Sequence, residues 1–157
     1  MEYNELMQGF ADAFGVKEME IEDGVTALDI DGTVVAFLHE DNTDAVILAA
    51  EIGTPPPDAD GHFVMTVLQA NFLYRSTDGA TIAINPENGA YVIQRSEPLG
   101  SLDVASLSSK VEALVNAAEN WRQILHGFQE AEQALEEQDA SMPSLPQDFS
   151  QSGFLQV

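Results

Sequence analysis

The 157-residue sequence contains no cysteine, only five basic side chains and no long hydrophobic run. Without cysteine, the chain can form neither disulfide bonds nor thiolate zinc sites. The 27 acidic residues give a formal net charge of −22, which opposes binding to nucleic acids and anionic membranes because both require basic side chains. The apolar runs 33–38 and 45–50 are too short to cross a membrane. The first residues lack the features of a signal peptide, so we expect a cytoplasmic protein.

The composition is nevertheless that of a folded protein. Apolar residues make up 45% of the chain, which is enough for one packed core at this length. We expect residues 1–137 to form a single domain. Residues 138–157 contain no basic residue and no hydrophobic period, which predicts a disordered tail.

Three segments have the hydrophobic spacing of helices. Apolar residues recur at three- and four-residue steps between residues 6 and 14 and again between residues 107 and 128. The middle segment, 61–74, follows candidate caps at Asp58 and Asp60 and is apolar around most of its circumference. Such a helix needs cover on two sides, so we expect one side to contact a second subunit.

Strand patterns fill most of the remaining chain. The runs 25–30 and 33–39 flank Asp31-Gly32, which is typical of a tight hairpin turn. Further strands are predicted at 18–22, 45–52, 81–84 and 90–95, and the apolar run 45–52 predicts a central strand covered on both faces. Hairpin connections imply a small antiparallel sheet. The predicted order is a helix, three or four strands, a helix, two strands and a long helix, and the predicted fold class is α+β, with helices packed on the sheet.

One motif resembles a catalytic site. Asp29-Ile-Asp31-Gly32-Thr33 matches the DxDGT signature of haloacid-dehalogenase-type phosphatases, in which the aspartates act as nucleophile and general acid beside Mg²⁺. That chemistry also needs a downstream cationic group and a second acidic pair. Lys110 is the only downstream lysine and lies inside a predicted helix, and no GDxxxD-like pair appears later. A calcium loop would place Val34 where glycine is required. The pattern therefore favours a hairpin turn, and we expect no enzymatic activity, no metal and no cofactor.

Several short sequence motifs occur in an order that is typical of one family. They are Leu28-Asp-Ile-Asp-Gly32, Leu68-Gln-Ala-Asn-Phe72, Gly79-Ala-Thr-Ile-Ala-Ile-Asn-Pro86, Val92-Ile-Gln-Arg95 and Pro98-Leu99 before a helix with Ala118-Glu-Asn-Trp121. Over residues 4–128 the chain resembles the class I chaperones of bacterial type III secretion, the Tir-chaperone type family. The resemblance implies the element order α-β-β-β-α-β-β-α and a location in the bacterial cytoplasm.

The resemblance implies a function and two surfaces. The chain would be an ATP-independent chaperone that binds the N-terminal segment of a secreted effector and keeps it soluble and competent for export. The effector-binding patch would comprise Leu6, Phe10, Phe14, Val35 and Phe37. The chain would be a homodimer whose interface includes Phe63, Val67, Leu68, Phe72, Ile82 and Ile84. The strong negative charge leaves an alternative open, an acidic anti-activator or other interaction module that sequesters a regulatory protein.

Overall fold

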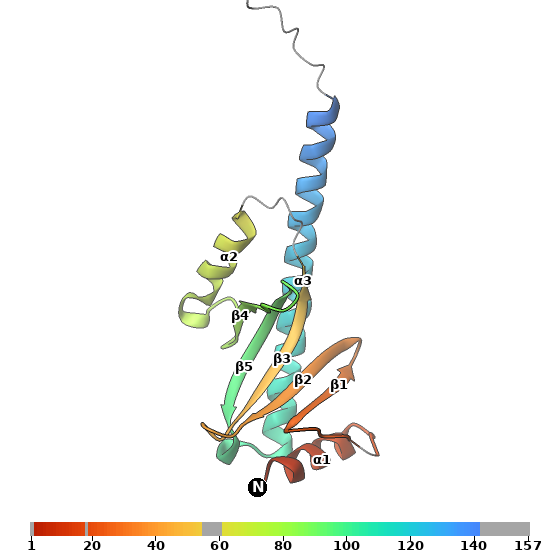
Figure 1. Ribbon diagram of the computed structural model, residues 1–157, viewed down its shortest axis with the longest axis vertical. Coiled ribbons are helices and arrows are strands. Elements are labelled where there is room, and N and C mark those ends of the chain that lie inside the picture. Colours follow the sequence, from red (N-terminus) through yellow and green to blue (C-terminus); the bar gives the residue numbers. More distant parts are fainter. Residues whose placement is uncertain (1, 18, 55–60, 142–157) are drawn as a thin grey trace, which may run out of the picture.

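The computed structural model describes residues 2–17, 19–54 and 61–141 (Figure 1). The elements follow the predicted order, with two short 3₁₀ turns added. They are α1 (Tyr3–Ala13), β1 (Val25–Ile30), β2 (Thr33–Glu40), β3 (Ala45–Gly53), α2 (His62–Asn71), η1 (Phe72–Tyr74), β4 (Thr81–Ile84), β5 (Tyr91–Pro98), η2 (Leu99–Ser101) and α3 (Val104–Ser141).

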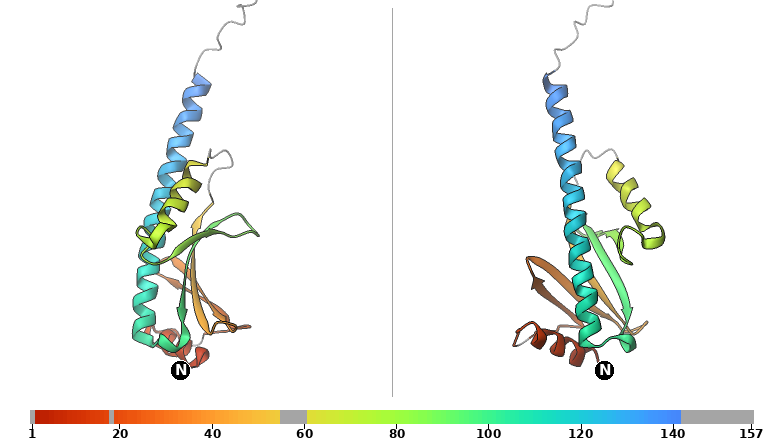
Figure 2. Two further views of the ribbon diagram at one scale, coloured as in Figure 1. Left: turned by 90° about the vertical axis from the view of Figure 1, so that its left-hand side faces the viewer. Right: turned by 180° about the vertical axis from the view of Figure 1, so that it is seen from behind.

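All five strands form one antiparallel sheet in the order β1-β2-β3-β5-β4. The helices lie on one side of this sheet, with α1 across one end and α3 running along it (Figure 2). We call the side that faces the helices the inner face and the opposite side the outer face. Because side chains alternate along a strand, Val35 and Phe37 of β2 belong to the inner face, whereas Val34 and Leu38 belong to the outer face.

The core lies between the inner face and α3. The predicted seam of α3 is buried there, with its residues at four- and three-residue steps: Leu107, Val111, Leu114, Ala118, Trp121 and Leu125. The helix begins at a capping interaction in which Ser106 N donates to the carboxylate of Asp103 at 2.7 Å. This interaction lowers the pKa of the Asp103 carboxyl, because the hydrogen bonds favour its charged form.

The hairpin between β1 and β2 has the predicted turn. Asp31 and Gly32 both have positive φ, 52° and 83°, as a two-residue turn between twisted strands requires. The Gly32 N–H donates to Asp29 Oδ1 at 2.8 Å. Asp29 is therefore part of a turn in an antiparallel sheet, whereas the phosphatase motif would need to end a strand of a parallel one.

Two expectations about the strands were wrong. Of the predicted strand 18–22, Glu18 lies outside the described residues, and residues 19–22 form only a single bridge, between Glu22 and Val25. β3 is central in the sheet, but only its inner face is covered, so Ile47 and Ala49 remain half-buried. An apolar run of this length is compatible with a strand covered on one face or on both faces. Only the position of the helices decides between these two cases.

The helix boundaries also differ from the predictions. α2 ends at Asn71 because the side-chain amide of Asn71 bonds both Ile82 N and Ile82 O of β4, and the chain then turns through left-handed conformations at Leu73 and Tyr74. α3 continues past residue 137 to Ser141, into the segment predicted as a tail. The candidate caps Asp58 and Asp60, and residues 142–157, lie outside the described residues.

Candidate protein-binding surfaces

The predicted effector-binding patch lies mostly inside the core. Leu6, Phe10, Val35 and Phe37 each have 0% exposure, and the rings of Phe10 and Phe37 are 5.4 Å apart. Only Phe14 is accessible, at 48%. Helix α1 directs its apolar side chains into the space between the sheet and α3. The four buried residues therefore cannot form an accessible patch in this fold.

An accessible apolar surface lies instead on the outer face of the sheet. No described helix covers it (Figure 2). Val34 is 57% exposed there, and Val25 and Leu38 are exposed on the same face. Half-buried Ala36, Ile47, Ala49 and Val92 continue the surface across β2, β3 and β5. Sequence reasoning missed this face because both faces of β2 are apolar from Val34 to Leu38.

The two edges of the sheet differ in their freedom to add a strand. At the β4 edge, the Asn71 amide already occupies the backbone N–H and C=O of Ile82. At the β1 edge, Thr26 Oγ1 donates to Glu20 O, but no described backbone pairs with the edge beyond Thr26. A hollow of about 490 Å³ lies beside β1, lined by Met19, Glu20, Thr26, Ala27 and Leu28. An extended segment can therefore pair with β1 more readily than with β4.

The expected dimer residues separate into core and surface. Phe63, Val67 and Ile82 are buried within the chain, and the ring of Phe63 contacts those of Tyr91, Trp121 and Phe128.

The other three expected dimer residues remain accessible. They are Leu68, Phe72 and Ile84, with Phe72 71% exposed. Neighbouring exposed residues extend this α2 surface, which we define as Met65, Leu68, Phe72, Leu73, Tyr74 and Ile84. Helical periodicity alone could not find Leu73 and Tyr74, because their exposure depends on the left-handed turn after α2.

Three of the five basic residues form hydrogen bonds or ion pairs with other residues of the chain. Arg122 of α3 donates to Glu51 O at 2.6 Å and to Thr33 Oγ1 at 2.8 Å. Arg95 and Lys110 both pair with Glu97, at 2.7 and 3.5 Å. These contacts leave Lys17 and Arg75 to balance an otherwise acidic exterior. Apolar and basic segments are therefore the partners that this exterior favours.

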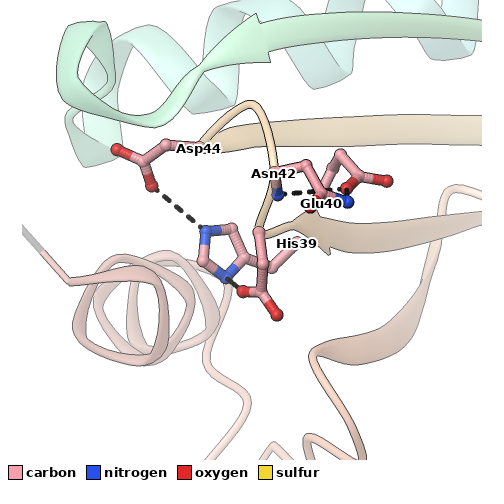
Figure 3. Close-up of polar contacts among 5 residues, drawn as sticks. His39, Glu40, Asn42 and Asp44 are labelled. Carbon is pink, nitrogen blue, oxygen red and sulfur yellow. Dashed lines mark hydrogen bonds and ion pairs between the residues drawn. The ribbon is translucent and has the colours of Figure 1, made fainter.

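The turn between β2 and β3 brings two carboxylates to the end of the sheet that α1 covers. His39 lies between the carboxylates of Asp41 and Asp44, at 3.2 and 3.3 Å (Figure 3). Its ring also stacks on Tyr3 of α1, with centroids 5.0 Å apart. This histidine holds α1 against the turn, which is a structural role.

Two further searches of the described residues gave negative results. No group of three metal-ligating side chains occurs within residues 2–17, 19–54 and 61–141. Over the same ranges, no helix is long and apolar enough to span a membrane.

The fold and these surfaces agree with a family of secretion chaperones. The family model of the Tir chaperone protein (CesT) family matches residues 5–122, and the chain belongs to this family. A protein of Chlamydia pneumoniae, CPj0713/CpB0740, is 24% identical over 119 residues, which cover 74% of this chain and 90% of that protein.

Solved structures share the fold. The chain matches the HopA1-SchA chaperone-effector complex with a TM-score of 0.66 and 17% identity, covering 77% of this chain and 93% of the other. It matches the Yersinia pestis type III secretion chaperone SycH, in complex with a fragment of YscM2, with a TM-score of 0.61 and 19% identity, covering 76% and 99%. The predicted α+β fold and family resemblance are confirmed. The part of α3 beyond residue 122 lies outside the family match.

Proposed function

We propose that the protein is a type III secretion chaperone that binds the N-terminal segment of a secreted effector. The observation that carries this proposal is the uncovered apolar outer face in a chain of the Tir chaperone family. Contiguous exposed apolar surface is typical of protein-interaction sites. The outer face replaces the buried residues of α1 and β2 as the proposed effector-binding patch. Phe14, which is exposed at the end of α1, remains a separate candidate contact.

The proposed working unit is a homodimer in the bacterial cytoplasm. Its interface is the α2 surface, because this is the second concentration of large exposed apolar side chains and lies next to the short β4 strand. Burial of Phe72, Leu68 and their neighbours in a second copy would remove this surface from water. Three of the six dimer residues expected from the sequence, Leu68, Phe72 and Ile84, stay in the proposed interface.

The proposed mechanism is passive and uses no ATP or catalysis. The effector segment covers the outer face and pairs with the open edge of β1, so that apolar burial and backbone hydrogen bonds hold it non-globular and soluble. A stable interface of this kind buries on the order of 1,600 Å². Two outer faces in a dimer would provide such an area along one wrapped segment.

The test is capture of the partner from the bacterium that encodes the chain. We expect the tagged protein to retain a protein whose secretion by the type III system fails when the chaperone gene is deleted. Limited proteolysis of the complex should protect the N-terminal region of that protein. A Val34→Asp variant, which places a charge on the outer face, should lose capture and keep the fold. Unaltered secretion in the deletion strain would refute the proposal.

The net charge of −22 supports a second candidate, sequestration of a basic regulatory protein. Binding to such a protein should weaken strongly with salt, because it depends on screened charges. Capture of a regulator that is not secreted, with binding lost at high salt, would favour this function over the chaperone.

A further inference from the structure

The outer face has a row of small residues that crosses the strands. Ala27 of β1 pairs with Ala36 of β2, and Ala36 pairs with Ala49 of β3. The row continues to Gln94 of β5 and Thr81 of β4, next to a hollow of about 310 Å³ that Tyr74 and Gly79 help to line. We call this the alanine row. Its three alanines allow a partner backbone to approach the sheet closely over β1, β2 and β3.

Larger side chains border the alanine row on both sides. On one side, Val25, Leu38 and Ile47 form an apolar line across three paired strands. On the other side, Asp29 pairs with Val34, and the next residue across the sheet is Glu51 of β3, because Val35 pairs with Ala50. This second line therefore alternates acidic and apolar side chains.

The spacing between the borders suits a helix. Val34 and Leu38 are four residues apart on β2, which corresponds to about 13–14 Å along a strand. An α-helix with its side chains is about 10–12 Å wide, so a helix lying along the alanine row fills the space between the borders. A single extended strand would fill much less of it.

The acidic border lacks a counter-charge within the protein. No basic side chain of the described part of the chain pairs with the carboxylate of Asp29 or Glu51, and Arg122 binds the backbone oxygen of Glu51 from the inner side. Asp29 and Glu51 lie two strands apart, which is about 10 Å. Along a helix, this distance corresponds to about seven residues at 1.5 Å per residue.

We propose that Asp29 and Glu51 select a partner helix whose apolar stripe is flanked on one side by basic residues about seven positions apart. This inference rests on the proposed function, since it specifies the part of the client that covers the outer face. The apolar stripe supplies contact with Val25, Leu38 and Ile47. The two basic residues set the direction and register of the helix on the sheet.

The test uses three synthetic amphipathic peptides of about 14 residues with the same leucine stripe. The first carries two lysines about seven positions apart on one flank, the second carries them about four apart, and the third has glutamine at these positions. Fluorescence anisotropy measures their affinity for the full-length protein, and circular dichroism measures helix formation on binding. We expect the first peptide to bind about fivefold more tightly than the third, with the second between them.

Variants of the protein locate the effect. Asp29→Asn combined with Glu51→Gln keeps the Oδ1 acceptor for Gly32 and should abolish the preference for lysine. The control, Glu112→Gln with Glu119→Gln, removes the same charge from exposed positions of α3 and should keep the preference. Raising the salt from about 0.1 M to 1 M should reduce the preference in the wild type. Ala27→Phe adds a ring to the alanine row and should weaken the binding of all three peptides.

Several results would overturn the inference. Equal affinity of the first and third peptides, or a preference that survives in the Asp29 and Glu51 variant, removes the role of the two carboxylates. Three outcomes would rule out binding of a helix on the alanine row. They are failure of all three peptides to bind, binding without helix formation, and unchanged binding to the Ala27→Phe variant. None of these results tests the chaperone function, which depends on the separate capture and secretion experiment. Failure of this inference can therefore be distinguished from failure of the proposed function.

Discussion

Replacing Phe37 with alanine tests whether the residues first expected to bind the effector are structural. Phe37 is fully buried on the inner face, contacts Phe10 and pairs with Leu48 across the sheet. Truncation of a buried phenylalanine costs about 3–5 kcal/mol, because transfer energy is lost and a cavity remains. This is a large fraction of the roughly 5–15 kcal/mol that stabilises a typical domain. We therefore expect a severe loss of stability in Phe37→Ala.

The assay is urea unfolding at fixed protein concentration, since any dimer makes stability depend on concentration. Trp121 is the only tryptophan and is buried against Phe63, so its fluorescence reports the core. With a urea dependence of about 2 kcal/mol per molar, the midpoint should fall by about 2 M. The matched control is Val34→Thr on the outer face of the same strand, which should change stability by less than about 0.5 kcal/mol. Equal midpoints for the two variants would refute the assignment of the faces.

Three further predictions follow from particular contacts. Phe72→Asp on the α2 surface should convert a dimer to a folded monomer in sedimentation equilibrium, and an unchanged mass would remove this surface from the proposed interface. Asn71→Ala should lower the free energy of unfolding by about 1–2 kcal/mol, because it exposes the unpaired N–H and C=O of Ile82; a change near zero in urea unfolding would show that the amide does not hold β4. Burial raises the pKa of Tyr3 to about 12 from 10.0. Its neutral form therefore contributes stability that is complete below pH 10.0 and is lost as the pH rises towards about 12, by about 2–3 kcal/mol. Tyr3→Phe should reduce this alkaline loss in unfolding measured across the same pH range, and an identical pH dependence in the variant would contradict the burial argument.

Local patterns predicted the elements that depend on nearest neighbours in the chain. The Asp31-Gly32 turn, the two hairpins and the seam of α3 all appear as expected, because turn chemistry and hydrophobic period are properties of the sequence itself. The end of α2 was not predictable in this way, since the Asn71 side chain reaches Ile82 eleven residues later. The period of α3 weakens after Phe128, yet the helix continues to Ser141.

The sequence by itself determined the fold class, the order of the elements and the family of the protein. Only the tertiary structure decided which apolar residues are accessible. Residues 34–38 of β2 are apolar on both faces, so alternation could not show which face the helices cover. Packing of α1 and α3 on one side buried Leu6, Phe10, Val35 and Phe37 and left Val34 and Leu38 exposed. Burial is a property of the whole fold, because each face of a strand becomes core or surface only when another element packs against it.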